Sequence, residues 1–480
     1  MTKHALEQKV KTLMEENQRL QQRLAEVERE LAKLRKTSKT SSKPPSSDMV
    51  KPPKAPQAPS VFGSRTAGGQ PGHPKHERAA FPPEELTTIH TYTLSSCPQC
   101  GGPLRAAEQA PKVIQQVEIE EVPIRIEEHR GLAFWCASCQ RVHYAPLPPT
   151  VTKGGLCGPR LTALVAYMKG ACHASFSTIR KFLRDVVKMP VSRGYLRKLI
   201  AKMSDALEPA FDELLQALPE QDVLNIDETG HKDGGERFWT WCFKASMYTL
   251  FRIDKSRSSQ VLLDVLGEEF NGLIGCDYFS AYRKYMRLNE QVKVQFCLAH
   301  LIRDVKYLMT VPDADTRCYG ECLREELRQM FAIFHRGQEQ EWAPATFQRS
   351  LDVARDRIVT IATTRVPSTS EAQNMAKRFI THGDSFFQFI TYQDWIEPTN
   401  NLAEQAIRFV VIDRRITQGT RSQAGRAWCE RIWTVMATCT QHGLDVCDFL
   451  YRSLCAYWNQ SDSPSLLPAP SCLSLRHDSG

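Results

Sequence analysis

Three acidic residues stand where a protein could hold a metal ion. Asp227 comes at or near the end of an apolar run from Val223 to Ile226, which predicts a buried β-strand. Asp277 ends a second such run 50 residues later, and Glu404 falls on an expected helix. Glu228 cannot join Asp227 in one site, because successive strand side chains point to opposite faces. We therefore interpret Asp227, Asp277 and Glu404 as one metal site.

The residue types indicate which metal this would be. Carboxylates are hard oxygen ligands, and a few suffice for Mg²⁺ because that ion keeps several waters. Two such ions about 3.5–4 Å apart activate the nucleophile and stabilise the leaving oxygen in phosphodiester cleavage. Asp227 would bridge both ions, Asp277 would hold one and Glu404 the other. A single carboxylate at a strand end is more often structural or solvated, so the interpretation depends on the three together.

A second group of residues has the spacing of a zinc site. Cys97 and Cys100 form one C-x-x-C pair, and Cys136 and Cys139 form another. Four thiolates make a closed tetrahedral site, so zinc here would be structural and would stabilise a small ribbon. The alternative is a redox pair, but no thioredoxin-like βαβ pattern surrounds either pair.

The order of the expected elements indicates an α/β fold. Strands are predicted at 223–229, 238–243, 248–253, 272–278 and 292–296, with a helix at 258–266. Three strands, a helix and a fourth strand with its carboxylate is the order of a ribonuclease H-like core with a mixed sheet. The 127 positions between Asp277 and Glu404 exceed a simple connection, so we expect a helical insertion.

The N-terminal segment carries a heptad pattern. Its seam consists of Leu6, Val10, Leu13, Asn17, Leu20, Leu24, Val27, Leu31 and Leu34. Four heptads with a single polar Asn favour a parallel two-stranded coiled coil, and so a homodimer, over a helix that packs on its own protein. The following Lys-, Ser- and Pro-rich stretch predicts a flexible basic linker. It is either a solvated tail or an arm that contacts DNA phosphates.

Short helices are expected after the cysteine pairs. They cover about 161–168, 177–187 and 192–203, and Ser192 is a suitable N-cap for the last of them. This pattern fits either a helix-turn-helix DNA-binding unit or a plain connector. Arg193, Arg197 and Lys198 favour DNA slightly.

These patterns together predict eight segments. They are a coiled-coil helix at 1–36, a flexible basic linker at 37–90, a zinc ribbon at 91–150, a helical, possible helix-turn-helix region at 151–217, the first part of the catalytic domain at 218–310, a helical insertion at 311–395, the catalytic and C-terminal helices at 396–460 and a disordered tail at 461–480. The net charge of +8 is compatible with nucleic acid. Scattered cysteines and the lack of a long apolar run predict a cytoplasmic protein without a membrane span.

Several motifs together resemble the insertion sequence 66 family of DDE transposases. They are Ser41–Asp48, Gly68–His73, the paired C-x-x-C ribbon, Ile226-Asp227-Glu228-Thr229, Cys297-x-x-His300-x-x-Arg303 and Asn400-Asn401-x-x-Glu404-x-x-Ile407-Arg408. The resemblance implies a ribonuclease H-like core, Mg²⁺ dependence, and an enzyme that cleaves the ends of its own element and joins the 3′ ends to target DNA. It also implies that accessory proteins of the same element take part. The three acidic residues correspond to Asp227, Asp277 and Glu404.

Further residues are expected to bind DNA or support the site. They are His300, Arg303, Arg408, Arg414 and Arg415, the last two with Arg421 in a basic loop after the Glu404 helix. Cys297 and His300 could instead simply pack, and Arg408 could pair with Glu404 one turn away. Two other functions stay open: a catalytically silent DNA-binding relative, and a nuclease that hydrolyses DNA without joining it.

Overall fold

The computed structural model describes residues 3–34, 80–91, 99, 103, 113–116, 123–136, 138–339 and 342–467. Contacts divide the chain into two units, residues 1–49 with 127–480, and residues 50–126. The second unit contains the 3-10 turn η2 (Pro83–Glu85). Just before this turn, the Phe81 N–H donates to Gln115 Oε1 at 2.6 Å, and Gln115 Nε2 donates to Phe81 O at 2.9 Å. Within the described residues, no helix is both long and apolar enough to cross a membrane.

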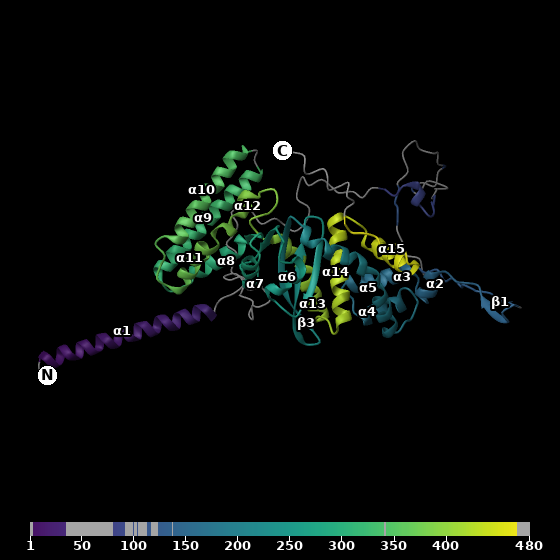
Figure 1. Cartoon of the computed structure of the whole chain (residues 1–480), viewed down its shortest axis with the longest axis horizontal. Coiled ribbons are helices and arrows are strands. Elements are labelled where there is room, and N and C mark those ends of the chain that lie inside the picture. Colours follow the sequence, from purple (N-terminus) through teal and green to yellow (C-terminus); the bar gives the residue numbers. More distant parts are fainter. Residues whose placement is uncertain are drawn as a thin grey trace. The chain divides into compact units, whose positions relative to one another are not determined.

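A five-stranded mixed sheet forms the centre of the larger unit (Figure 1). Its strands are β3 (Val223–Asp233), β4 (Glu236–Lys244), β5 (Thr249–Asp254), β6 (Leu273–Cys276) and β7 (Lys293–Phe296). Their order across the sheet is β5-β4-β3-β6-β7, with β3, β4 and β5 antiparallel and β6 and β7 parallel to β3. The expected α/β class and the five expected strands are confirmed.

The position of Asp227 within its strand differs from the prediction. β3 does not end near Asp227 but continues to Asp233, because its second half pairs with β4 in a hairpin. Gly234 and Gly235 close that hairpin with φ of +58° and +93°, a conformation that glycine adopts without steric cost. The pairing of β3 with β6 covers only Val223 to Asn225, so Asp227 lies two residues beyond it.

Helices fill the connections between the strands and both flanks of the sheet. Within the core are α6 (Ser259–Leu266), α7 (Ser280–Leu288) and α8 (Leu298–Leu308). The stretch expected to be helical consists of α9 (Ala314–Glu339), α10 (Pro344–Thr363), α11 (Ser370–His382), η4 (Gly383–Phe386) and α12 (Gln388–Thr391), and the last two contact β7. The C-terminal helices are α13 (Asn401–Thr417), α14 (Gln423–His442) and α15 (Val446–Asn459).

The segment before the sheet is helical, as expected. It contains α2 (Pro149–Gly154), α3 (Pro159–Gly170), α4 (Phe176–Asp185) and α5 (Arg193–Gln216), followed by the turn η3 (Leu218–Glu220). Ser192 caps α5 as predicted, since its side chain accepts a hydrogen bond from the Tyr195 N–H. α5 extends well beyond the expected end near Met203 and contacts α3, α14 and α15.

The predicted coiled-coil segment is one helix, α1 (Lys3–Leu34). The described seam side chains Val10, Leu13, Leu20, Leu24 and Val27 are each 50–60% exposed. The predicted zinc ribbon contains a short antiparallel hairpin of β1 (Ala133–Cys136) and β2 (Arg141–Tyr144). Cys97 and Cys100 lie outside the described residues, as does the Cys136 side chain, so the zinc site stays a prediction. The Cys139 thiol lies 3.1 Å from His143 Nε2.

Side chains of α14 satisfy the outer edge of the sheet. Glu430 Oε1, Thr434 Oγ1 and Thr438 Oγ1 accept the backbone N–H groups of Ile253, Phe251 and Thr249, at 2.6, 3.0 and 3.3 Å. Four helical residues rise about 6 Å, and two strand residues span about 6.8 Å, so this spacing matches every second N–H of β5. The helix therefore covers an edge that would otherwise expose unpaired donors.

We expect Thr434→Val to destabilise the fold by about 1–3 kcal/mol, because it leaves the buried Phe251 N–H without an acceptor while it conserves volume. Urea unfolding followed by circular dichroism would measure the change. Thr440→Val on the same helix is the matched control. The exposed Thr440 hydroxyl bonds only its own helix, so its loss should change the free energy of unfolding by less than about 0.5 kcal/mol. Equal effects of the two variants would contradict this role of α14.

Candidate metal centre

Asp227 and Asp277 each lie two residues beyond the last pair of β3 with β6, which is Asn225 with Gly275. Asp277 directly follows β6, as predicted, and its Oδ1 accepts the Phe279 N–H at 2.9 Å. Asp227 Oδ1 accepts the N–H of Glu228 at 2.9 Å. Both bonds are local, so each carboxylate keeps oxygen lone pairs for another ligand.

Glu228 points away from this site, as the alternation of the strand predicts. Its side chain is 1% exposed and accepts hydrogen bonds from Arg257 Nε at 2.9 Å and from the Tyr282 hydroxyl at 2.5 Å. Arg257 in turn lies 3.8 Å from the centre of the Phe279 ring, two residues after Asp277. Glu228 is therefore a structural residue that fixes the segment next to Asp277, a role that its sequence position did not reveal.

Glu404 lies in the first turn of α13, as expected, and the buried Asn400 at its N-cap position ties that turn to the sheet. Asn400 Nδ2 donates to Ile226 O at 2.8 Å, and Oδ1 accepts from Asn225 Nδ2 at 3.1 Å. The Asn400 N–H donates to the thiol of Cys297 at 3.3 Å. The side-chain amide and the backbone N–H of this one residue thus join β3, the start of α8 and the start of α13.

Asn225 needs a glycine opposite it on β6. A Cβ at Gly275 would come within 2.5 Å of Asn225 Nδ2, so a larger residue would displace the amide from Asn400. Neither Asn225 nor Gly275 carries a sequence signal of its own. Their roles follow only from the register of β3 against β6.

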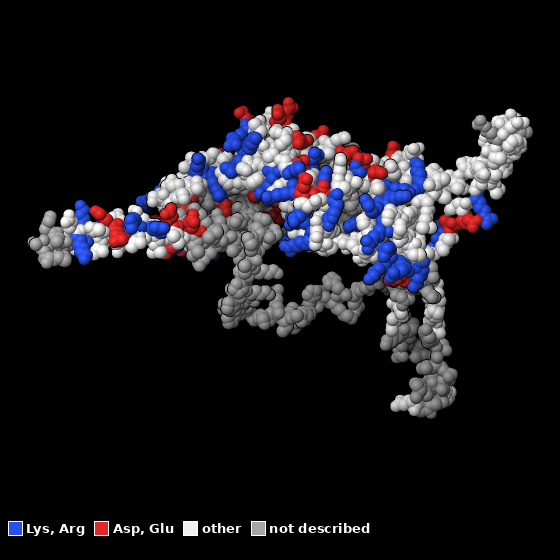
Figure 2. All heavy atoms as spheres, turned by 90° about the horizontal axis from the view of Figure 1, so that it is seen from below, with Lys and Arg blue, Asp and Glu red and all other residues white. Residues whose placement is uncertain are grey.

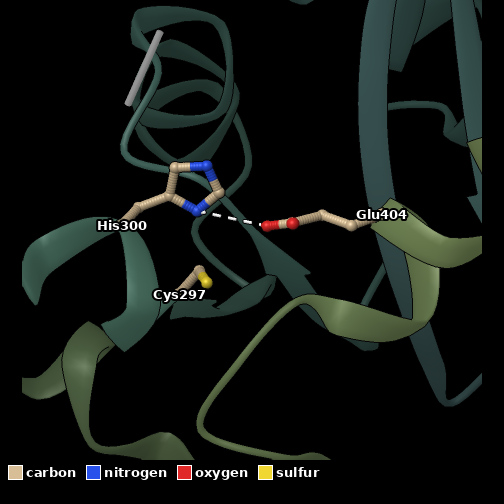
Figure 3. A group of neighbouring side chains, drawn as sticks. All are labelled: Cys297, His300 and Glu404. Carbon is tan, nitrogen blue, oxygen red and sulfur yellow. Dashed lines mark ion pairs between the residues drawn. The ribbon is translucent and has the colours of Figure 1, made fainter. Parts of the chain in front are cut away.

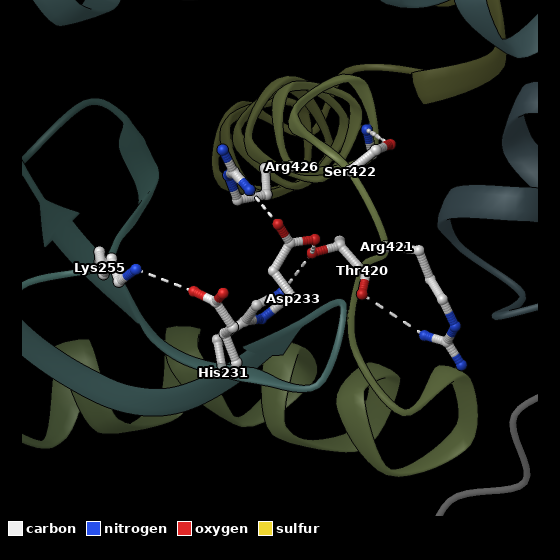
Figure 4. A network of polar contacts seen from close by, with 9 residues as sticks. His231, Asp233, Lys255, Thr420, Arg421, Ser422 and Arg426 are labelled. Atoms are coloured by element: carbon white, nitrogen blue, oxygen red, sulfur yellow. Dashed lines mark hydrogen bonds and ion pairs between the residues drawn. The ribbon is translucent and has the colours of Figure 1, made fainter.

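The far end of α13 is held by a second polar network (Figure 4). Thr420 Oγ1 donates to Asp233 Oδ1 at 2.8 Å and lies 3.0 Å from His231 Nε2, and Arg426 pairs with Asp233. Burial lowers the pKa of His231 to about 4, so the ring is neutral, with its Nε2–H donated to Thr420. Gly419 permits the approach, because a Cβ there would lie 2.2 Å from Lys232 O.

The electrostatics indicate that the three acids share one environment. Burial, and then the nearby carboxylates of Glu228, Asp277 and Glu404, hold the pKa of Asp227 well above its usual value. Burial and Glu228 raise the pKa of Asp277 to about 7. Burial also raises the pKa of Glu404, against Arg303 and Arg408. The charges of Asp277 and Glu404 thus disfavour the charge of Asp227, and a divalent cation beside Asp227 would be electrostatically favourable.

Glu404 also faces the start of α8 (Figure 3). His300 Nδ1 lies 3.6 Å from Glu404 Oε1, and Arg303 lies 3.8 Å from Oε2. The ligand atoms of Cys297, His300 and Glu404 all lie within 4.8 Å of one another. Among the described residues, this is the one such cluster of three or more side chains that can bind a metal. Asp227, Asp277 and Glu404 are thus more widely spaced as a set. The Cys297–His300 motif therefore lies at the site and not in remote packing.

The other basic residues divide into two groups. Arg408 is exposed, and the two ion pairs of Glu404 in the described part of the chain are with His300 and Arg303. Arg414 is turned to the sheet, where it donates to Thr229 Oγ1 at 3.0 Å and to Gly230 O. Arg414 and Arg415 lie in the last turn of α13 and not in a loop, because the helix continues to Thr417. Arg421 is in the loop that follows.

A groove of about 1520 Å³ lies between α3–α5 and the junction of α13 with α14. Its basic lining residues are Lys169, Arg197, Lys198, Arg421 and Arg431, and its acidic ones are Asp205 and Asp413. Asp413 pairs with His173 at 2.8 Å, and Arg431 pairs with Asp205 and Glu208. Figure 2 shows Lys and Arg side chains gathered toward the end of the body that carries α4 in Figure 1.

Comparison with known proteins identifies the family. Residues 154–427, more than half of the chain, match the model of the Transposase IS66 family. The chain belongs to this family. Residues 2–79 match a family of unknown function (DUF6444). An uncharacterized protein, y4qI, of Sinorhizobium fredii is 23% identical over 354 residues, which are 67% of this chain and 64% of that protein. The chain therefore spans less than two thirds of the length of this relative.

The matched region includes every residue of the candidate centre, from β3 to the start of α14. It also includes the helices α3 to α5 that line the groove. The heptad helix α1 lies in the part that matches the family of unknown function. The cysteine pairs at 97–100 and 136–139 lie between the two matched regions.

We expect Asn400→Ala to lower the free energy of unfolding by about 2–4 kcal/mol, since the side-chain partners Asn225 and Ile226 O are buried. Urea unfolding would measure the loss. Asn401→Ala is the control: this neighbour is exposed, and its replacement should change stability by less than about 0.5 kcal/mol. A similar small change in both variants would show that the amide does not hold α13 to the sheet.

Proposed function

We propose that this protein is a DNA transposase of the DDE type, which cleaves the ends of its own element and joins the 3′ ends to target DNA. The observation that carries the proposal is that the charges of Asp277 and Glu404 both raise the pKa of the buried Asp227. Family membership and the mixed five-stranded sheet of order β5-β4-β3-β6-β7, which we interpret as a ribonuclease H-like core, support it.

The centre fits Mg²⁺ as the cofactor. Its three carboxylates supply hard oxygen donors, and Glu404 Oε1 is buried without a hydrogen-bond partner. When bound, two Mg²⁺ ions would activate the attacking water or 3′-hydroxyl and stabilise the leaving oxygen. We propose that Asp227 bridges the two ions, Asp277 holds one and Glu404 the other.

The chain's own residues prepare the site for this chemistry. Asn400 orients α13 so that Glu404 faces the sheet, and Glu228 with Arg257 fixes the segment that carries Asp277. Arg303 offers a positive charge near Glu404, 29% exposed, where it can contact a DNA phosphate. The exposed Arg408 and Arg415 extend this positive charge along the outer face of α13.

We expect Asp227→Asn, Asp277→Asn and Glu404→Gln each to reduce strand cleavage and joining to the level of a reaction without protein. DNA binding should persist, and the melting temperature should not fall, because burial raises the pKa of each of the three carboxylates, so the folded chain disfavours their charged forms. The assay uses labelled DNA with the ends of the element and Mg²⁺. The exposed Glu397→Gln is the control and should keep activity.

The same experiment separates the alternatives. A nuclease without joining activity would cleave the ends but fail to join DNA supplied with pre-cut 3′ ends. A silent DNA-binding relative would bind the ends with no cleavage in the wild type, under conditions that include the element's accessory proteins. Either result would contradict the proposed transposase.

We propose that the groove between α3–α5 and α14 contacts the DNA backbone. On the side of α5 that lines the groove are Arg197 and Lys198, both exposed. Ser192 caps the start of that helix. The seven residues between α4 and α5 exceed the 3–4-residue turn of a helix-turn-helix unit, so the helices would act through phosphate contacts.

We expect the double variant Arg197→Ala/Lys198→Ala to weaken DNA binding to all sequences alike. Loss of two phosphate contacts should reduce the slope of log K against log salt by about 2. Fluorescence anisotropy at several salt concentrations would measure it. Arg349→Ala/Arg357→Ala removes the same charge from exposed positions on α10, and an equal effect there would assign the change to net charge alone.

We propose further that α1 pairs with a second copy as a parallel coiled coil and that the paired cysteines hold a structural zinc. The exposed apolar seam supports the first. Leu13→Lys/Leu20→Lys should convert a dimer to a monomer in analytical ultracentrifugation, because both residues lie in the seam. Glu15→Lys/Gln22→Lys, outside the seam, should leave the dimer intact. A monomeric wild type would contradict the coiled coil.

A further inference from the structure

A second group of ligands meets at Glu404, and it differs in chemistry from the acidic triad. Cys297 is the N-cap residue of α8, and His300 follows three positions later, so both lie on the same face of the first helical turn. Glu404 approaches from the first turn of α13 (Figure 3). One sulfur, one imidazole nitrogen and one carboxylate oxygen then lie within 4.8 Å of one another.

Two of these atoms are buried and have no hydrogen-bond partner among the residues that the structure describes. They are His300 Nδ1 and Glu404 Oε1. They face each other at 3.6 Å, which is too long for a hydrogen bond. Buried polar atoms are rarely left unsatisfied, so a pair that points into one space indicates a bound ligand.

The distances suit a small cation with soft ligands. Zinc bonds of about 2.3 Å to sulfur and 2.0–2.2 Å to nitrogen or oxygen place neighbouring tetrahedral ligand atoms roughly 3.3–3.8 Å apart. The His300–Glu404 separation already falls in this range, and the 4.8 Å limit leaves about 1 Å of adjustment for the sulfur. Three protein ligands leave a fourth position for water or substrate.

We propose that Cys297, His300 and Glu404 form a binding site for a thiophilic divalent cation of the zinc class. Thiolate and imidazole ligands select such a metal over Mg²⁺, which prefers oxygen. Binding releases the thiol proton of Cys297 to solvent. Because Glu404 belongs to both sets of ligands, occupation of this site withholds it from the Mg²⁺ centre, and zinc inhibits the enzyme.

The inhibitory consequence rests on the proposed function, but the binding site does not. Cys297 also accepts the N–H of Asn400, so its thiol is already held at the junction of α8 and α13. Arg303 lies on the other carboxylate oxygen of Glu404, at 3.8 Å. A cation on Oε1 would leave that contact in place.

Cobalt titration of the full-length protein tests the site directly, because cobalt bound to a thiolate has a distinct charge-transfer absorption. Cys297→Ser and His300→Asn should each bind about one Co²⁺ equivalent fewer than the wild type and lose part of that absorption. Circular dichroism would establish that both variants are folded. Cys318→Ser, which removes an exposed thiol on α9, should bind as much cobalt as the wild type. Because the wild type and these variants share the other cysteine pairs, metal bound there cancels when their cobalt stoichiometries are compared.

Unchanged cobalt stoichiometry and absorption in both Cys297→Ser and His300→Asn would overturn the proposal. In that case an ordered water would satisfy His300 Nδ1 and Glu404 Oε1. If the wild type cleaves DNA, Cys297→Ser should require about 10–100-fold more Zn²⁺ for half-inhibition. If the wild type shows no cleavage, the proposed function fails, while the cobalt titration still decides the metal site.

Discussion

Buried carboxylates at the centre of this protein disfavour their own charge, so other contacts must supply the free energy that holds them there. Burial raises the pKa values of Asp227, Asp277 and Glu404, and the charges of neighbouring carboxylates raise those of Asp227 and Asp277 further. Other contacts must therefore offset the repulsion in the folded chain. The buried Asn400 provides the most direct of them, because its single amide joins β3 to the start of the helix that carries Glu404. The structure thus stores electrostatic strain that a cation would relieve.

Side-chain hydrogen bonds hold α13 to the central strand β3 and α14 to the edge strand β5. α13 is held to β3 near Ile226 by Asn400, in the middle by Arg414 and beyond its end by Thr420. α14 bonds the edge strand β5 through three side chains spaced four residues apart. Arg414 lies ten residues after Glu404, or about 15 Å along the helix at a rise of about 1.5 Å per residue, so α13 is fixed far from Glu404 as well as beside it.

Glu404 is the residue that the two proposed metal sites share. The acidic side of its environment offers oxygen donors from two strands, and the α8 side offers a thiol and an imidazole. A hard cation and a soft one would therefore favour different partners for the same carboxylate. In the proposed transposase, this arrangement would couple activity to the supply of zinc without a separate regulatory domain.

The sequence by itself determined the five strands, the helical stretch after residue 311 and the cap at Ser192, because these depend on local periodicity and on side-chain chemistry. It misplaced Asp227 at a strand end, because the hairpin that extends β3 to Asp233 is a pairing between distant residues. The electrostatic effect of residues 277 and 404 on Asp227 and the contact of His300 with Glu404 were decided only by tertiary structure. So were the roles of Asn225, Glu228 and Thr420. Each requires elements far apart in the chain to be placed within a few ångströms, which no local pattern encodes.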